Sequence, residues 1–382
     1  MKYFDYAASC PLDGEAEKAY LKASAEYYGN ASSLHDAGDK ARQLLEHCRR
    51  EFARFFGVSK NGIYFTSGGS EGNFLSIQAL LSASPKKGKH IVTGMAEHSS
   101  VANTMEKLKQ AGYEVTYLPL RPDGRIDPDC FGDALRDDTV VASIQHGNPE
   151  IGTIQPIEEI GRLCKEKGIL FHSDCVQTFG KSDLTTISPF VDSLTISGHK
   201  FYGPKGVGAV YVNPALAWKP FYPGTTHENG FRPGTVNVPG IAAMAVAAKK
   251  AIQQMEMRTK HFTHLRQTFM QSLAPAESTF IVYNADLPST VGMRVKGLEG
   301  QFVMLECNRR GFAISTGSAC SVNLQTPSKT MTAMGIAGKE AKEFIRISFG
   351  RETSGEDVKR LGETLVNIAN KKSASALPIT GK

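Results

Sequence analysis

The sequence predicts an α/β protein with a large, mostly parallel sheet and a smaller C-terminal α+β domain. Between about residues 60 and 215, seven apolar, β-rich runs alternate with helix-length stretches. The runs are apolar throughout, which is typical of strands covered on both faces of a parallel sheet. Ligands of such sheets lie at the carboxyl ends of the strands, so the polar residues that follow each run are the candidates for function.

The elements follow in order along the chain. Helices are expected first, over 15–28 and 36–56. The strands of the large sheet are then predicted at 62–65, 90–93, 115–118, 140–145, 169–172, 194–196 and 207–212, with amphipathic helices at 99–110 and 157–167. A long helical segment runs from Pro239 to about residue 273. The C-terminal strands are expected at 279–283, 291–295, 312–315 and 344–349, with helices at 300–310, 328–334 and 354–370.

These elements divide the chain into four parts. Residues 1–14 form an N-terminal segment near the active site, 15–258 a large domain and 259–370 a small domain, and 371–382 are expected to be a disordered tail because they are rich in Ser, Ala and Lys.

Composition excludes several classes of protein. The chain has 382 residues, of which 41% are hydrophobic and 21% charged, so it is long enough to bury a core and too apolar to be disordered. No apolar run reaches the roughly 18 residues that a membrane helix needs, and the N-terminus lacks the layout of a secretion signal. The net charge of +6 comes from scattered Lys and Arg residues, so no nucleic-acid partner is expected. A cytoplasmic protein that does not contact a membrane is predicted.

The chain has seven cysteines, which is an odd number. No C-x-x-C motif and no Cys/His cluster with zinc spacing occurs, so we expect neither disulfides nor a metal site. Most of these cysteines are expected to be small core residues.

The segment Ser197-Gly198-His199-Lys200 places a lysine at the end of a β-rich run, before a glycine-containing turn. A lysine held against a packed core acquires a depressed pKa, which suits Schiff-base formation. The alternative is a solvated lysine in a turn. Upstream, Asp174 ends another apolar run and is suited to holding a protonated pyridine nitrogen, although it is also a good turn cap.

Two further strands end in polar loops. The glycine- and serine-rich turn around Gly69 and Ser70 opens a helix and predicts either an anion site or an ordinary capped helix. His98 follows the next strand; a histidine there stacks on a ring or transfers protons, or is structural.

The C-terminal domain carries two candidates. Cys320 lies in a small polar loop, where a thiol is accessible and reactive unless its exposure is incidental. Arg346 lies within an apolar run, where its guanidinium needs either a substrate carboxylate or a protein partner.

In this order and spacing, from Asp5-Tyr6-Ala7-Ala8 to about residue 370, these motifs resemble the cysteine desulfurases of the NifS/IscS type, which depend on pyridoxal 5′-phosphate (PLP) and belong to the class V aminotransferase family with fold type I. The resemblance implies that Lys200 carries PLP, that Asp174 holds the pyridine nitrogen, and that His98 stacks on the ring. It also implies further cofactor contacts from Gln177, Asn148, Gly69, Ser70, Ser197 and His199, and from Thr235 of the other subunit of a homodimer.

The same resemblance implies the reaction. Arg346 and Asn148 would bind the substrate L-cysteine, and Cys320 would attack its sulfur, leaving L-alanine and a Cys320 persulfide for an iron–sulfur scaffold or another acceptor protein. The amino-acid sequence of residues 231–240 and 307–310 is similar to that of a NifS-like branch associated with NAD biosynthesis, whose client is quinolinate synthase. Aminotransferase or selenocysteine lyase activity, and a scaffold role without turnover, are the alternatives.

The chain departs from the family pattern at a few positions. Pro149 and Pro233 replace Asn and Ser, and Gly69-Ser70 replaces the more common Ala-Thr. Ser70 keeps a hydroxyl, so phosphate binding is expected to survive. Cys10 and Cys175 fall within motif segments where cysteine is unusual; we interpret them as core residues, and the alternative is that they are extra thiols near the site.

Overall fold

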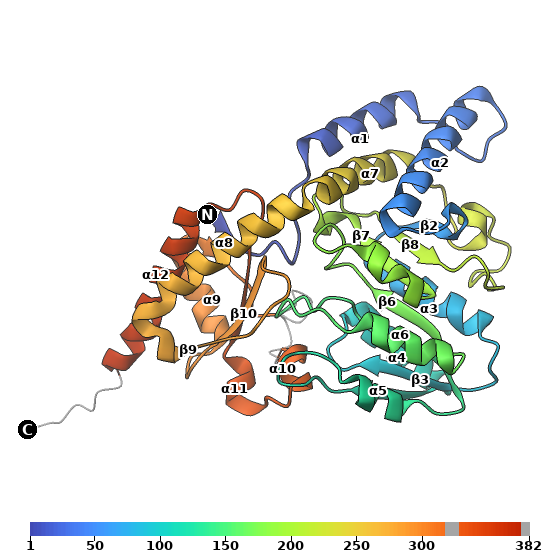
Figure 1. The fold of residues 1–382 in the computed structure, drawn as a ribbon. Coiled ribbons are helices and arrows are strands. Elements are labelled where there is room, and N and C mark those ends of the chain that lie inside the picture. The colour runs from blue at the N-terminus through green and yellow to red at the C-terminus, as the bar shows by residue number, and fades with distance from the viewer. Residues whose placement is uncertain (318–327, 376–382) are drawn as a thin grey trace, which may run out of the picture.

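The computed structural model describes residues 1–317 and 328–375, without the side chains of 371–375 (Figure 1). Its large sheet has the strand order β2-β8-β7-β6-β5-β3-β4. All strands are parallel except β8, which is antiparallel to both of its neighbours. The seven strands are β2 (Ile63–Thr66), β3 (His90–Gly94), β4 (Glu114–Leu118), β5 (Thr139–Ser143), β6 (Leu170–Asp174), β7 (Ser193–Ser197) and β8 (Gly208–Val212). The predicted α/β fold with a mostly parallel seven-stranded sheet is therefore confirmed.

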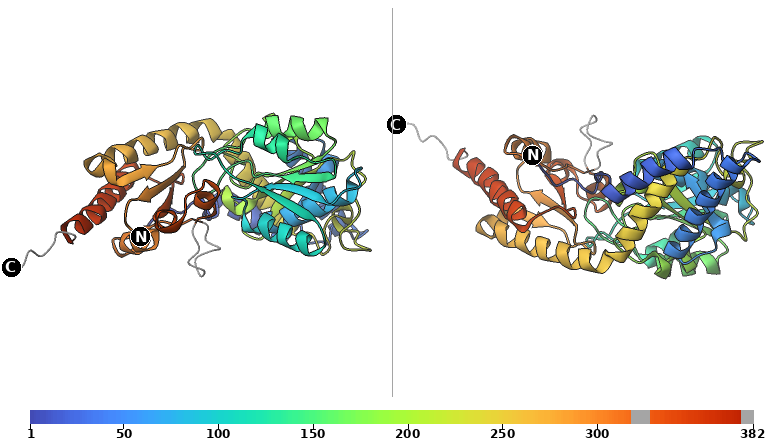
Figure 2. Two further views of the ribbon diagram at one scale, coloured as in Figure 1. Left: turned by 90° about the horizontal axis from the view of Figure 1, so that it is seen from below. Right: turned by 90° about the horizontal axis from the view of Figure 1, so that it is seen from above.

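Helices cover both faces of this sheet (Figure 2). One face packs against α3 and α4, and the other against α2, α6 and α7. Because successive side chains of a strand point to opposite faces, Ile91 of β3 lies in the first core and Val92 in the second. The helices of this part are α1 (Gly14–Glu26), α2 (Asp36–Phe56), α3 (Gly69–Ala83), α4 (Ser99–Gln110), α5 (Pro128–Ala134), α6 (Ile157–Glu166) and α7 (Val238–Gln253).

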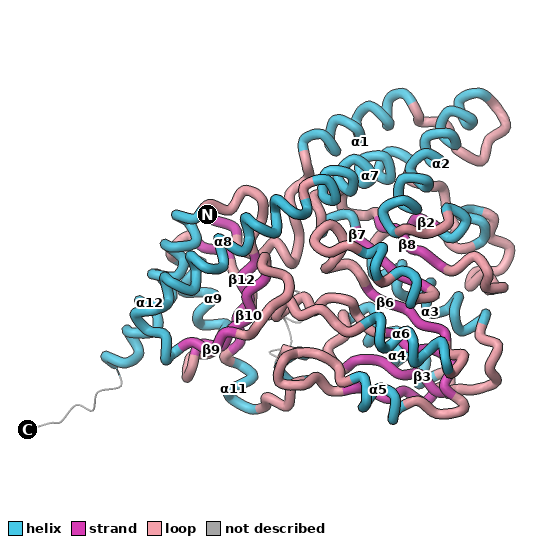
Figure 3. Tube along the Cα trace, viewed as in Figure 1, coloured by secondary structure: helices cyan, strands magenta, loops and turns pink. Residues whose placement is uncertain are grey.

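A second, antiparallel sheet has the order β12-β10-β9 and a core of its own (Figure 3). It is built from β9 (Phe280–Val282), β10 (Thr290–Val295) and β12 (Phe344–Ser348), and from the helices α8 (Met255–Leu273), α9 (Gly300–Arg309), α10 (Lys329–Ala333), α11 (Gly338–Lys342) and α12 (Gly355–Ser375). The strand predicted at 312–315 is shorter, β11 (Phe312–Ala313), and pairs with β1 (Lys2–Tyr3) instead of joining this sheet.

The long helical segment after Pro239 is divided at Gln254 into α7 and α8. Buried residues of α7 belong to the core of the large sheet, whereas those of α8 belong to the core of the small one. The boundary expected between residues 258 and 259 falls inside α8 and stays a prediction. The tail expected from residue 371 stays a prediction, although α12 continues to Ser375. The Lys and Ala residues there have high helix propensity; residues 376–382 lie outside the described part.

The two sheets meet at the carboxyl edge of the large one (Figure 1). The loops that follow β2, β3, β5, β6 and β7 all leave the sheet at this edge, because these strands are parallel. The C-terminal strand β12 and the N-terminal segment face the same edge. Polar residues from segments far apart in sequence are thereby brought together.

Candidate active site

A cavity of about 260 Å³ lies at the carboxyl edge of the large sheet. Nine of the residues that the sequence predicts for the site line it: Gly69, Ser70, His98, Asp174, Gln177, Ser197, His199, Lys200 and Arg346. They come from the segments at the ends of four strands, β2, β3, β6 and β7, and from β12, so the topology, and not proximity in sequence, assembles the cavity.

Lys200 ends a short 3₁₀ turn, Gly198–Lys200, directly after β7. Its Nζ donates hydrogen bonds to the backbone oxygens of Ala7 at 2.7 Å and of Ala8 at 2.9 Å. Burial, followed by the positive charges of Arg346 and Lys181, lowers the pKa of Lys200 to about 8. A substantial fraction of this amine is therefore neutral, and nucleophilic, near physiological pH.

Asp174 is the last residue of β6 and is buried. One carboxylate oxygen, Oδ2, accepts a hydrogen bond from Asn73 Nδ2 at 2.7 Å, and the other accepts one from the backbone N–H of Val176 at 2.9 Å. Asn73 Oδ1 also lies 3.2 Å from His172 Nε2. Burial lowers the pKa of His172 to about 3, so its ring is neutral. Asp174 is thus fixed in orientation by partners that carry no charge.

His98 caps α4 and lies in the same cavity. Its Nδ1 is 2.8 Å from Ser100 Oγ and accepts a hydrogen bond from the backbone N–H of Ser100 at 3.2 Å. Burial lowers the pKa of His98, with Lys200 acting in the same direction and Asp174 opposing it. The imidazole is therefore neutral at pH 7 and presents Nε2 for stacking or proton transfer.

The N-terminus of α3 forms one wall of the cavity. Its N-cap residue Gly68 has φ of 146°, a conformation that favours glycine. Because glycine has no side chain, the first turn of the helix receives no side-chain cap. A Cβ atom at Gly68 would lie 3.6 Å from Ser197 Oγ. Backbone N–H groups at a helix start, with the hydroxyls of Ser70 and Ser197 beside them, form a site for an anionic oxygen group.

Arg346 lies on β12, opposite this wall, and is 2% exposed. One terminal nitrogen donates to Asp5 Oδ1 at 2.7 Å and the other to the backbone oxygen of Pro149 at 3.2 Å. Within the described residues its Nε has no hydrogen-bond partner. A buried guanidinium with an unpaired N–H is suited to a ligand carboxylate, because carboxylate oxygens pair with it in a bidentate geometry.

Two of the predicted site residues within the described part of the chain do not line the cavity. Asn148 is buried, and its amide donates to Thr330 Oγ1 at 3.0 Å and accepts from the backbone of Glu150 and Ile151. Thr235 is exposed and lies outside the cavity of this chain. Cys320 lies outside the described residues.

The two cysteines of the motif segments differ. Cys175 is fully buried, in agreement with its interpretation as a core residue. That interpretation is wrong for Cys10, which is half-buried and lies near the site: its Sγ is 3.5 Å from the backbone oxygen of Lys200. The pairing of β1 with β11 brings this segment into the site, and no local pattern reports such long-range pairing.

Sequence reasoning also missed several residues of the site. Asn73, Gln145 and the backbone of Ala7 and Ala8 all line the cavity, and Asp5 pairs with Arg346. Asn73 lies one turn into α3. The one sequence signal that could have indicated it is its position shortly after the glycine-rich turn that opens this helix. The fold and the cavity define an α/β enzyme site with an amine of lowered pKa, an oriented carboxylate and an anion-binding helix start.

Comparisons with known proteins agree with this class. The family model for class-V aminotransferases matches residues 2–361. A relative from Bacillus subtilis (strain 168), named as a cysteine desulfurase of the NifS type, is 47% identical over 97% of this chain and 95% of its own length. The cysteine desulfurase IscS of Dictyoglomus turgidum is 38% identical over 97% of this chain and 94% of its own. The chain therefore belongs to the class-V aminotransferase family, whose members are PLP-dependent enzymes.

Solved structures show the same fold. A NifS-like protein superposes with a TM-score of 0.89 at 30% identity, covering 97% of this chain and 99% of that chain. A structure described as SspA in complex with cysteine superposes with a TM-score of 0.77 at 32% identity, over 91% of this chain and 99% of that one. Within the described residues, no helix is long and apolar enough to cross a membrane.

Proposed function

We propose that the protein is a cysteine desulfurase that converts L-cysteine to L-alanine and leaves the sulfur as a persulfide on Cys320. The observation that carries this proposal is the presence in one cavity of the Lys200 amine, the Asp174 carboxylate and the partly unpaired Arg346 guanidinium. Relatives that match the chain over nearly its whole length are named as cysteine desulfurases, which supports the same reaction.

The residues of the cavity fit PLP as cofactor. We propose that Lys200 holds it covalently, that Asp174 pairs with its ring nitrogen and that His98 stacks on its ring. Gln177 would contact its phenolic oxygen. Its phosphate would lie at the start of α3, with contacts from Gly69, Ser70, Ser197 and His199. The uncapped first turn of α3 supports this placement, because its N–H groups are available to phosphate oxygens. When bound, PLP supplies an electron sink for the electron pair left on the substrate Cα.

The protein's own residues would then bind and orient L-cysteine and move its protons. Arg346 would pair with the substrate carboxylate through its unpaired Nε, while Asp5 and Pro149 hold the rest of the guanidinium in place. Lys200, whose amine is freed when the substrate amine takes its place, would take the proton from Cα, and neutral His98 would relay a proton to or from the thiol. The Cys320 thiolate would attack the substrate sulfur as the Cβ–S bond breaks, so that the persulfide S–S bond forms while the carbon fragment keeps the electron pair and is protonated to alanine.

The reaction can be tested on the purified protein in a single tube. A visible absorbance band that shifts when L-cysteine and a reductant are added, with sulfide and alanine formed in equal amounts, is the expected result. A keto acid in place of alanine would indicate transamination instead. A colourless protein that PLP cannot reconstitute would contradict the proposal.

The lowered pKa of Lys200 predicts how PLP attaches to the apoprotein. Only the neutral amine attacks an aldehyde, so the rate constant of reconstitution should rise by about tenfold per pH unit below pH 8 and level off above it. An unperturbed lysine would keep the rate rising to beyond pH 10. Stopped-flow measurement of the visible band across this range distinguishes the two profiles.

Replacing Cys320 by serine should leave PLP binding and the spectral change on adding L-cysteine intact, but abolish sulfide release, because the sulfur then has no acceptor thiol. Cys130→Ser is the matched control, since Cys130 is the exposed cysteine on α5, and it should keep full activity. Sulfide release that survives in Cys320→Ser would instead implicate Cys10, whose Sγ lies 3.5 Å from the backbone oxygen of Lys200.

The remaining parts of the proposal concern partners. We propose a cytoplasmic homodimer in which Thr235 completes the phosphate site of the other subunit; its exposure, outside the cavity of its own chain, supports this role. The persulfide would pass to an acceptor protein of iron–sulfur cluster assembly. The similarity of 231–240 and 307–310 to a NifS-like branch of NAD biosynthesis favours quinolinate synthase as the client.

A further inference from the structure

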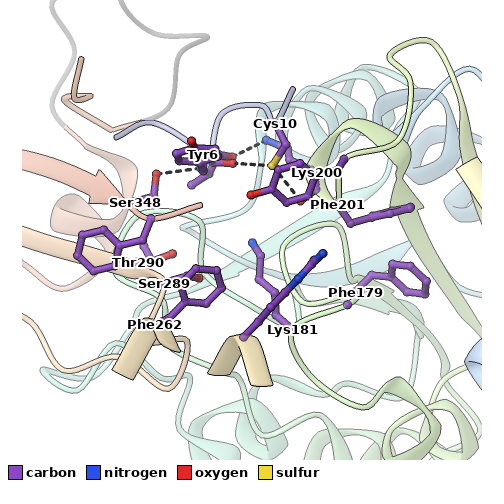
Figure 4. Close-up of a pocket in the computed structure, with 15 residues that line it drawn as sticks. Tyr6, Cys10, Phe179, Lys181, Lys200, Phe201, Phe262, Ser289, Thr290 and Ser348 are labelled. Atoms are coloured by element: carbon purple, nitrogen blue, oxygen red, sulfur yellow. Dashed lines mark hydrogen bonds between the residues drawn. The ribbon is translucent and has the colours of Figure 1, made fainter. Parts of the chain in front are cut away.

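A second, smaller cavity lies behind the candidate active site (Figure 4). Its volume is about 30 Å³, and Lys200 lines both this cavity and the larger one. Cys10 and Tyr202 also line it, and Figure 4 shows Lys181 across from Cys10. The small cavity thus lies against a side of Lys200 that has no part in the proposed reaction.

Positive charge dominates the lining of this small cavity. Lys181 and Arg258 contribute to it beside Lys200, whose amine is partly neutral and would be taken up by the cofactor, and no described residue that lines it is an aspartate or a glutamate. The nearby carboxylates have cations of their own: Asp13 pairs with Arg351 and Lys250, and Glu352 pairs with Arg351. The charge of the lining residues is therefore not balanced by neighbouring carboxylates.

Two of these cations lack full hydrogen bonding. Arg258 is 9% exposed and buried against Tyr202, and within the described residues its Nε has no hydrogen-bond partner. The Nζ of Lys181 is 3.5 Å from Gln177 Oε1, at the outer limit of a hydrogen bond, and within the described part of the chain it has no shorter one. Buried donors of this kind are costly unless a ligand or an ordered water accepts from them.

We infer that this small cavity is a binding site for a monovalent anion of a single heavy atom, chloride or hydrosulfide, held between Lys181 and Arg258. The volume has room for about two water-sized particles and therefore fits an ion of a single heavy atom. A single negative charge there offsets the excess of cations and accepts from the unpaired Nε. The inference does not depend on the proposed desulfurase reaction, because it concerns binding alone.

Chloride binding can be measured directly by ³⁵Cl NMR line broadening of the purified holoenzyme, with gluconate keeping the ionic strength constant. Broadening that saturates with chloride is expected for the wild type. Lys181→Met and Arg258→Met should each weaken binding by at least about tenfold, since each removes one of the two charged donors. Lys249→Met, at an exposed lysine of α7, is the matched control and should bind as the wild type does.

Hydrosulfide, added as a competitor, decides between the two anions. Relief of the chloride broadening identifies hydrosulfide as an occupant, and broadening that persists assigns the site to halide; both results support a single-atom anion site. The inference would be overturned if the wild type showed no saturable broadening. It would also be overturned if Lys181→Met and Arg258→Met showed the same broadening as the wild type, and the cavity would then hold water. If both variants fail to fold, the wild-type melting temperature in chloride against gluconate gives the test, and an equal value in both salts overturns it.

Discussion

Lys200→Ala is expected to lose the visible absorbance of covalently bound PLP and to lower the rate of sulfide release by about 10⁴-fold or more. Lys200 is the one lysine among the described residues that line the larger cavity, so no other amine of that lining can replace it. The variant should still fold, because the side chain contributes two hydrogen bonds to backbone oxygens and little apolar packing.

The measurement is an absorbance spectrum of the variant after incubation with PLP, with sulfide assayed from the same sample. Lys249→Ala serves as control, since Lys249 is an exposed lysine on α7 and should retain both the band and the activity. A normal visible band in Lys200→Ala would show that another amine holds the cofactor and would refute the assignment.

The second large effect is expected for Asp174→Ala. In the role proposed for it, Asp174 keeps the ring nitrogen of the cofactor protonated, so loss of this buried carboxylate should reduce kcat by about 10⁴-fold, by analogy with the carboxylate that orients a catalytic imidazole. The visible band should remain but shift in wavelength, since Lys200 still holds the cofactor while the protonation of its ring changes. Absorbance and steady-state kinetics on one preparation separate these two effects.

Asp192→Asn is a matched control, because Asp192 is a half-buried carboxylate just before β7, at the opposite edge of the sheet. Its Oδ2 accepts a hydrogen bond from the backbone of Phe171, so the change should lower the free energy of unfolding and leave the spectrum unchanged. An Asp174→Ala enzyme with unchanged kcat would contradict the role given to Asp174.

The strands of the large sheet were predictable to within about two residues, for a physical reason. A strand covered on both faces must be apolar throughout, and runs such as 140–145 have no other explanation in a chain of this composition. Lys200 and Asp174 were predictable in the same way, because they are the first charged residues after such runs and parallel strands end at one edge.

The parts that escaped prediction depend on contacts between distant segments. The pairing of β1 with β11 joins residues about 310 positions apart, and neither strand is long enough to carry a pattern of its own. Asn148 has the polar character of a ligand-binding residue, yet its amide is occupied by Thr330, and sequence alone does not show which partner a polar group takes. Asn73 is hidden for the same reason: its role comes from facing Asp174 across the sheet edge.

The pairing of Lys2–Tyr3 with Phe312–Ala313 also sets the order in which the site can be completed during synthesis. The N-terminal strand leaves the ribosome first, but its partner emerges about 310 residues later, and Ser348, which accepts from the backbone of Ala7, later still. The large sheet can therefore fold before the backbone oxygens that accept hydrogen bonds from the Lys200 amine are in position. A nascent or truncated chain would have its main core in place and lack a complete site until about the last fifth of the sequence arrives.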